Sequence, residues 1–200
     1  MSLSSKAIWK QRKRARHKQE MKELSLHILD LVQNSLRAEA KCIQLSVTDS
    51  VSQDKVEITI EDDGRGMDGA LLAKVTEPFV TTRTTRNMGM GIPLFQMAAE
   101  QTGGSFHIDS TPGQGTALRS MFVRSHIDTP PLGDMVETLV TLVQGAPDVD
   151  FLYRYTTDGR EFQFDTREMR EILEDVPLNA PDVLHWIRGH LEELEASIDN

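Results

Sequence analysis

Three polar residues of one predicted helix have the types and the spacing that suit a site for a metal-bound nucleotide. Asp30 and Asn34 are four residues apart, so on a helix their side chains project side by side. The carboxylate could orient or deprotonate a nucleophile, and the amide oxygen could ligate Mg²⁺, an ion that prefers oxygen ligands. Arg37 lies one turn further along, where its guanidinium suits a phosphate oxygen. The alternative for this trio is an ordinary solvated helix face.

The segment EDDGRGMD, residues 61–68, is a second candidate. Asp62 ends an alternating strand pattern, so its carboxylate could accept a hydrogen bond from an exocyclic amine. Gly64 and Gly66 would let the backbone approach a flat ring, and Met67 could cover the other face of that ring. A tight turn between a strand and a helix is the alternative.

A loop rich in Thr, Arg and Gly precedes the next predicted helix. Gly89, Met90 and Gly91 lead into that helix, where backbone N–H groups can bind a phosphate and the helix dipole favours an anion. Upstream, the loop supplies hydroxyl groups and cations from Thr81, Thr82, Arg83, Thr84, Thr85 and Arg86. A loop of this composition could close over a polyphosphate, and simple helix-capping glycines are the alternative.

A last short motif, Gly113 to Thr116, predicts a turn that opens a strand. The hydroxyl of Thr116 would either point toward the same site or hydrogen-bond locally. By itself the motif does not decide between the two.

Periodic patterns predict the elements that must position these residues. Apolar residues recur at helical spacing from Leu24 to Ala40 and from Ile92 to Thr102, and a short helix is expected within 64–75. Alternating patterns predict four strands, at residues 41–49, 55–63, 105–110 and 116–125. This order favours an α+β fold, a two-layer sandwich with helices on one face of a mixed, mostly antiparallel sheet.

The pair Pro130-Pro131 interrupts regular structure and predicts a boundary. The chain then divides into a basic arm (1–22), a domain with the candidate site (23–127) and a C-terminal extension of unknown role (128–200). The extension reads as a small helix-hairpin-helix unit, with elements at residues 132–144, a hairpin turning at 158–159, a helix opened by the capping-box spacing Asp165…Glu168, and a helix at 182–198. The apolar stripe of the last helix favours core packing over a homodimer contact.

Charge is divided unevenly along the 200 residues, whose net charge is -9. Residues 1–22 hold eight Lys and Arg against one Glu, hence +7, and the remainder holds 14 basic against 30 acidic residues, hence -16. Such an arm could bind nucleic acid, an anionic membrane surface or an acidic partner. Because Trp9 is its only aromatic residue, a solvated extension is favoured over nucleic-acid binding.

Several classes of protein are disfavoured by composition. No apolar run approaches the roughly 20 residues that cross a bilayer, and the N-terminus lacks the apolar stretch of a secretory signal. The single Cys42 cannot form an internal disulfide, and His126, His185 and His190 lack zinc-ligand spacing with it. We therefore expect a cytoplasmic protein with no membrane span.

Taken together, the motifs resemble those of the GHKL superfamily, whose ATP-binding fold DNA gyrase B, heat-shock chaperone ATPases, sensor histidine kinases and MutL proteins share. The matching segments are residues 24–40 (N box), Asp62–Gly66 (first glycine box), Glu77-Pro78-Phe79 (F box), Gly89–Gly91 (second glycine box) and Gly113–Thr116 (third). The resemblance covers roughly residues 22–125. It implies the Bergerat ATP-binding fold, with ATP and Mg²⁺ as ligands.

The resemblance also implies roles for single residues. Asn34 matches the Mg²⁺-binding asparagine, and Asp62 matches the residue that reads the adenine amine, with Gly64, Gly66 and Thr116 completing the base pocket. Gly89 and Gly91 match the hinge and phosphate contacts of the ATP lid. Asp30 stands where the family usually has a glutamate that activates water or positions the acceptor, so this chain could bind ATP normally and turn it over slowly.

Arg37 and the EPF sequence make the domain resemble the histidine-kinase branch. No phosphoacceptor helix pair with the H-box pattern precedes it, and His17 and His27 lack that context. Stand-alone relatives of this type include anti-sigma-factor serine kinases, so we expect Mg²⁺-dependent transfer of the γ-phosphate to a separate protein. An ATPase conformational switch and a non-catalytic ATP sensor are the alternatives.

Overall fold

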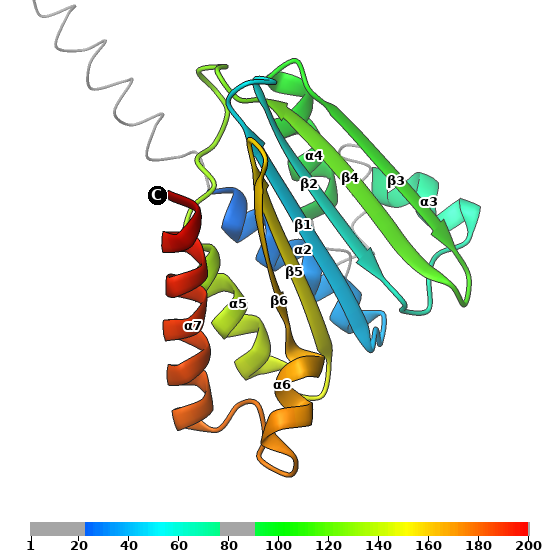
Figure 1. Ribbon diagram of the computed structural model, residues 1–200. Coiled ribbons are helices and arrows are strands. Elements are labelled where there is room, and N and C mark those ends of the chain that lie inside the picture. Colours follow the sequence, from blue (N-terminus) through cyan, green and yellow to red (C-terminus); the bar gives the residue numbers. More distant parts are fainter. Residues whose placement is uncertain (1–22, 77–90, 200) are drawn as a thin grey trace, which may run out of the picture.

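One mixed sheet of six strands carries the fold, and the helices cover one of its faces (Figure 1). The structure is a computed structural model that describes residues 23–76 and 91–199. Its strands are β1 (Cys42–Ser50), β2 (Lys55–Asp62), β3 (Ser105–Thr111), β4 (Gly115–Val123), β5 (Asp150–Thr157) and β6 (Arg160–Asp165). They lie in the order β3-β4-β2-β1-β5-β6; β1 and β5 are parallel, and the other neighbouring pairs are antiparallel. The predicted α+β class with a mixed, mostly antiparallel sheet is confirmed.

The described helices are α2 (Leu24–Arg37), α3 (Gly69–Thr76), α4 (Gly91–Gln101), α5 (Met135–Gly145), α6 (Thr166–Leu173) and α7 (Pro181–Asp199). Figure 1 shows α2 and α4 behind the sheet, with α5 beside α2 and α7 beside α5. Side chains of β1 and β2 alternate between this covered face and solvent, and Ile43, Leu45, Val47, Val56, Ile58 and Ile60 are buried. The alternating patterns in the sequence thus correspond to strands with one buried face.

Helix α2 lies across the sheet because its apolar residues recur every three or four positions. Leu24, Ile28 and Val32 are fully buried. The predicted helix over 24–40 ends at Arg37 in the structure, which corrects its C-terminal bound. Glu39 adopts a left-handed backbone with φ of 64°, and such a residue cannot continue a right-handed helix.

The C-terminal extension holds the start of α2 in place. The first two backbone N–H groups of the helix, on Leu24 and Ser25, donate to the carbonyls of Pro131 and Leu132 at 2.9 and 2.8 Å. Glu23, the residue before the helix, does not cap it with its side chain. Since unpaired N–H groups at a helix start need acceptors, the segment after the predicted boundary supplies them.

The extension also continues the sheet and the core of the preceding residues. Strand β5 pairs with β1 from Cys42 opposite Asp150 onward, and β6 forms a hairpin with β5. Tyr153 and Phe164 of this hairpin are buried in the same apolar cluster as the residues of α2. Residues 128–199 therefore extend the α/β sandwich across its β1 side.

Two details of the extension can be compared with the sequence. Helix α6 begins after Asp165, but the Asp165 carboxylate accepts from the backbone N–H of Arg167, at 2.9 Å, so the expected bond to Glu168 is replaced. The Arg167 guanidinium also pairs with that carboxylate, which favours a bond to the N–H of Arg167 over one to the N–H of Glu168. The apolar stripe of α7 is buried against the chain's own core, which confirms core packing.

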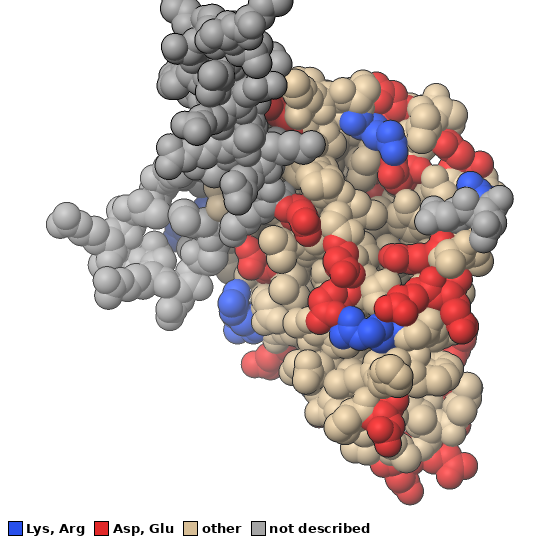
Figure 2. Space-filling view, turned by 90° about the vertical axis from the view of Figure 1, so that its left-hand side faces the viewer, with Lys and Arg blue, Asp and Glu red and all other residues tan. Residues whose placement is uncertain are grey.

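Two surface properties follow from the described residues. None of the helices within 23–76 and 91–199 is long and apolar enough to cross a membrane. Figure 2 shows a face on which acidic side chains outnumber basic ones, and it includes α7, which lies at the left of Figure 1. That face repels polyanions, so nucleic acid is not favoured as its ligand. The basic arm itself lies outside the described residues.

Candidate nucleotide site

A row of side chains runs across four strands at one end of the sheet. Asp62 of β2 lies opposite Ile43 of β1 on one side and Thr116 of β4 on the other, and Thr116 lies opposite Ser110 of β3. Ile60, two residues before Asp62, is buried under the helices, and residues two apart on a strand share a face. The row therefore faces the helix layer, where α2 passes over it.

The Asp62 carboxylate is fixed from two sides. The buried hydroxyl of Ser35, on α2, donates to its Oδ2 at 2.6 Å, and the backbone N–H of Gly64 donates to Oδ1 at 3.0 Å. A carboxylate offers about four acceptor positions, so about two remain for a ligand. Ser35 lies among the buried residues of α2. In the sequence Ser35 is a hydroxyl residue among apolar ones. The helical pattern gives no reason to connect it to Asp62, which is 27 positions away.

Gly64 and Gly66 have close neighbours within the chain itself. A Cβ on Gly64 would lie 2.8 Å from the carbonyl oxygen of Ala38, and one on Gly66 would lie 2.0 Å from the carbonyl oxygen of Thr111. Gly66 also has a φ of +65°, which side chains rarely adopt. These contacts pack the loop after β2 against the end of α2 and the end of β3, independently of any ligand.

Ser110 connects two of the predicted motifs, and the sequence did not single it out. Its hydroxyl oxygen lies 2.8 Å from the backbone nitrogen of Met67, 2.9 Å from the carbonyl oxygen of Gly115 and 2.9 Å from Oγ1 of Thr116. The first glycine motif and the third are thus held together at one hydroxyl group. Met67 lies at this junction, half-buried.

The polar face of α2 meets the start of α4. A Cβ on Gly91 would lie 3.5 Å from Cβ of Asp30 and 3.9 Å from Nδ2 of Asn34, so the helix start passes close to both side chains. Helix α4 is anchored one turn later by Phe95, which is fully buried and packs on the rings of His27, Phe106 and Phe122. The structure thus brings Asp30, Asn34 and Gly91 together.

Arg37 and Asn34 contact each other directly. The Arg37 guanidinium donates to Oδ1 of Asn34 at 2.9 Å, which is the amide oxygen of the predicted metal ligand. A guanidinium and a divalent cation on one oxygen would repel each other. Binding of a metal at Asn34 would therefore turn Arg37 away from this oxygen.

The remaining predicted contacts belong to the loop before α4. Thr81, Thr82, Arg83, Thr84, Thr85, Arg86, Gly89 and Met90 lie outside the described residues, as does the Glu77-Pro78-Phe79 motif. Their roles stay predictions.

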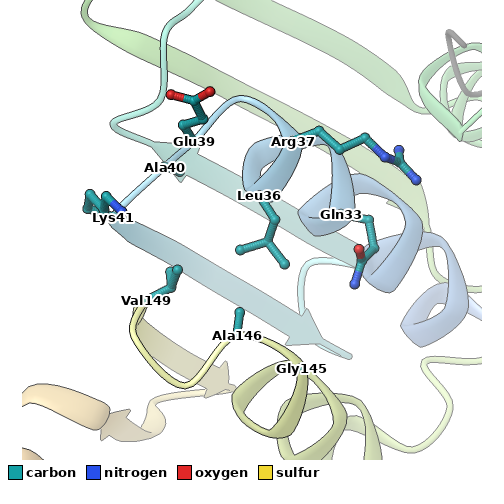
Figure 3. Close-up of a pocket in the computed structure, with 9 residues that line it drawn as sticks. All are labelled: Gln33, Leu36, Arg37, Glu39, Ala40, Lys41, Gly145, Ala146 and Val149. Atoms are coloured by element: carbon teal, nitrogen blue, oxygen red, sulfur yellow. The ribbon is translucent and has the colours of Figure 1, made fainter.

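A hollow of about 570 Å³ lies on the other flank of α2, where the ends of α2 and α5 meet the starts of β1 and β5 (Figure 3). It is lined by Gln33, Leu36, Arg37, Glu39, Ala40, Lys41, Gly145, Ala146 and Val149. In Figure 3, Leu36 points toward α5 and Arg37 extends along α2 in another direction. Of the predicted site residues that the structure describes, only Arg37 borders this hollow, so the hollow is distinct from the row at Asp62.

The part of the chain that holds the candidate site matches a family of known proteins. Residues 20–126 match the family model described as histidine kinase-, DNA gyrase B-, and HSP90-like ATPase. A MutL ATPase domain from Aquifex aeolicus, complexed with ADP, aligns with a TM-score of 0.46 and 14% identity over 77% of this chain and 69% of that one.

Sequence relatives match about half of the chain. A putative sensor protein of Shewanella frigidimarina is 32% identical over 54% of this chain and 17% of its own length. Sporulation kinase A of Bacillus subtilis is 25% identical over 52% of this chain and 17% of its own. Sensor protein kinase FleS of Pseudomonas aeruginosa is 36% identical over 44% of this chain and 22% of its own. The matched region spans about a fifth of each relative's length.

Proposed function

The chain belongs to the family of histidine kinase-, DNA gyrase B-, and HSP90-like ATPases, and from this premise we propose that it binds ATP with Mg²⁺ at the Asp62 end of the sheet. One observation carries the proposal. Asp62 and Thr116 are strand neighbours, Asp62 is bonded to Ser35 of α2, and the same helix brings Asp30 and Asn34 close to the start of α4.

The base would lie against Asp62. Its carboxylate is oriented by Ser35 and Gly64 and has acceptor positions left for the exocyclic amine of adenine. Thr116 is the cross-strand neighbour of Asp62, so its hydroxyl would border the same edge of the ring. The N-terminus of α4 would then face the phosphates, because its N–H groups and dipole favour anions.

Asn34 fits the magnesium ion by the chemistry of its donor atom. Its amide oxygen, which accepts from Arg37, could turn to an ion, since the same side chain has its Nδ2 near the start of α4, and Mg²⁺ is commonly held by one or two protein oxygens together with phosphates and water. When bound, the ion would neutralise phosphate charge. Arg37, displaced from Asn34, would reach a phosphate oxygen with its guanidinium.

Asp30 would orient the group that receives the γ-phosphate. Two of the relatives named above are kinases, which favours transfer to a hydroxyl or imidazole of a separate protein over release to water. A carboxylate one carbon shorter than glutamate must come within about 3 Å of the acceptor proton, directly or through one water.

Two other functions remain as outcomes of the test. An ATPase switch would release phosphate to water and change an interface with the nucleotide state. A sensor would hold ATP unchanged. The basic arm and residues 128–200 would then supply the surfaces for a partner.

The test follows the γ-phosphate. The full chain is incubated with Mg²⁺ and γ-labelled ATP, with and without cell extract, and free phosphate, labelled protein and remaining ATP are measured. Label on a second protein supports transfer, and free phosphate supports the switch. The Asp62→Asn variant should lose every signal. The matched control is Asp63→Asn, because the adjacent Asp63 carboxylate bonds the backbone N–H groups of Lys41 and Cys42 and should not touch the nucleotide.

If the Asp62→Asn variant transferred label as fast as the unmodified chain, the Asp62 end of the sheet would be excluded as the site of transfer. The same result for hydrolysis would exclude this site for the switch.

A further inference from the structure

Strand β3 forms an edge of the sheet, and none of the strands within the described residues pairs with its outer side. Exposed and half-buried residues alternate from Ser105 to Thr111, so one row of side chains faces solvent and the other faces the helix layer. The N–H and C=O groups on the outer side of an edge strand can pair with another extended chain. The strand is therefore a place where a second chain could extend the sheet.

The residues of β3 are complementary to themselves in one antiparallel register. A twofold axis at Ile108 would place each residue opposite the one at the same distance on the other side of the axis. His107 of each copy then lies opposite Asp109 of the other. Side chains directly opposite each other have Cβ atoms about 4.5–5.5 Å apart, which is within reach of an imidazole and a carboxylate. An axis at His107 would instead set two imidazoles opposite each other, and an axis at Asp109 would set two carboxylates opposite each other.

The other residues of the strand fit the same register. On the face toward the helices, Ile108 lies opposite its own copy and Phe106 lies opposite Ser110. On the open face, Ser105 lies opposite Thr111. The register at Ile108 therefore sets no like charges opposite each other.

The opposite edge strand, β6, has no equivalent register. An axis at Gln163 would set two acidic residues, Glu161 and Asp165, opposite each other, and an axis at Phe162 would offer no charge pair. Like charges directly opposite each other destabilise a strand pair. Charge therefore favours β3 over β6 as the edge that a second copy pairs with.

His107 and Asp109 already contact each other within one chain. Nε2 of the imidazole lies 2.8 Å from Oδ2 of the carboxylate, and the two side chains are 74% and 75% exposed. An exposed pair of this kind contributes little to stability, so sharing it with a second copy costs little. Each carboxylate would then lie beside two imidazoles, its own and that of the second copy, and it has acceptor positions for both.

Apolar surface lies beside the same edge. The turn that leads into α3 packs on the end of β3, where the N–H of Met67 donates to the Ser110 hydroxyl at 2.8 Å. Helix α3, which Figure 1 shows on the β3 side of the molecule, has no fully buried residue, and its Leu71 is 37% exposed. Pairing of one strand per copy makes a small interface, and contacts with α3 would enlarge it.

We propose that two copies of this chain form a dimer through β3, paired antiparallel about Ile108, so that two six-stranded sheets join into one. A second copy fits this edge because its own order of residues supplies an acid opposite each imidazole. The twofold axis also closes the assembly, since each copy uses the same edge and no β3 edge is left unpaired. Such a dimer does not depend on nucleotide binding, so it stands apart from the proposed function.

Sedimentation equilibrium of the full chain, without nucleotide and over a range of concentrations, tests this dimer. The unmodified chain should dimerise as the concentration rises. His107→Asp leaves only carboxylates among the four facing groups, and Asp109→Lys removes both carboxylates. We expect each variant to weaken the dimer about tenfold or more, because the opposite charges are lost. Both positions are exposed, so both variants should fold, and melting curves by circular dichroism check this.

An equimolar mixture of the two variants gives the sharpest readout. One chain then brings two carboxylates, and the other brings an imidazole and an ammonium group, so that an acid lies opposite a base at both positions. We expect the mixture to dimerise although each variant alone does so weakly. An effect confined to a single chain cannot produce this rescue.

The matched control is Glu161→Lys, a charge reversal at an exposed position of β6, which should leave dimerisation unchanged. A monomer at every concentration of the unmodified chain would overturn the proposal. So would a dimer that neither His107→Asp nor Asp109→Lys weakens, a mixture that stays monomeric, or a dimer that Glu161→Lys weakens as strongly as His107→Asp does.

Discussion

Two carboxylates at opposite ends of the sheet differ in what their hydrogen bonds leave free. Asp158, in the turn between β5 and β6, accepts four bonds from the turn after β1, through the hydroxyls of Ser50 and Ser52 and the backbone N–H groups of Val51 and Ser52. Asp62, at the far end of β2, accepts two from the chain. Asp158 ties two turns together and is saturated, whereas Asp62 is oriented and keeps acceptors for a ligand.

The same contrast holds for the glycines of the two ends. Gly159, beside Asp158, has a φ of +92° and no atom within 4 Å of where a Cβ would lie. Gly115, beside Thr116, has a φ of +102°, and its Cβ would lie 1.8 Å from the carbonyl oxygen of Asp62. At the turn a glycine serves backbone conformation alone, while at the site it also lets two strand ends meet closely.

The largest effect is expected from Gly115→Ala. Its Cβ would overlap the backbone of Asp62, so strand pairing at the site must open, and we expect a loss of about 3 kcal/mol or more in the free energy of unfolding. Urea denaturation measures it. Gly159→Ala and Gly113→Ala are matched controls with positive φ and open space, and each should cost only about 1 kcal/mol. Equal losses in all three would remove the contrast between the two ends.

A smaller effect is expected from Arg37→Ala. Without the guanidinium the phosphates lose a charged partner, so affinity for Mg²⁺-ATP should fall about tenfold while affinity for adenosine stays unchanged. Titration calorimetry with both ligands provides the comparison. Lys41→Ala is the control, because Lys41 is a cation that lines the same hollow as Arg37 and is not a predicted phosphate contact. A parallel loss for adenosine would show that Arg37 supports the fold of the site instead of the phosphates.

The smallest effect concerns acid stability at the opposite end. Hydrogen bonds from the hydroxyls of Ser52 and Ser50, and from backbone N–H groups, lower the pKa of Asp158 from 3.8 to about 2. Because the folded pKa lies below the unfolded one, this stabilisation is present above about pH 4 and is lost as the pH falls toward 2.

Asp158→Asn should therefore lower the melting temperature slightly at pH 6 and show a smaller further drop between pH 4 and 2. Melting curves by circular dichroism measure both proteins across this range. If the mutant lost stability between pH 4 and 2 as steeply as the unmodified chain, other carboxylates would be responsible for the acid sensitivity.

Much of the fold follows from local patterns in the sequence. Periodicity located the strands and helices, and the resemblance to the GHKL superfamily implied one pocket for Asp62 and Thr116 before their register was known. The placement of β5 beside β1 was not predicted, because pairing strands more than 100 residues apart leaves no local signal. The end of α2 depends on the left-handed backbone of Glu39. A glutamate in the sequence gives no indication of that conformation.

For the candidate site, the sequence indicated the residues with obvious chemistry. It did not indicate the residues that orient them. Ser35 lies on the apolar face of α2, where the sequence pattern indicates a residue that only packs in the core. Ser110 lies in a strand and belongs to no recognised motif. Their importance comes from distances to Asp62 and Thr116 that only the folded chain shows. The contact between Arg37 and Asn34, three residues apart, is local and could have been anticipated from helical spacing.

The most direct test of the central claim compares the two carboxylates in one assay. Titration calorimetry measures the affinity for Mg²⁺-ATP of the full chain, of Asp62→Asn and of Asp158→Asn. The account predicts that the unmodified chain binds ATP, that Asp62→Asn weakens binding about 100-fold, and that Asp158→Asn leaves the affinity unchanged. No binding by the unmodified chain, or equal affinities for all three proteins, would contradict it.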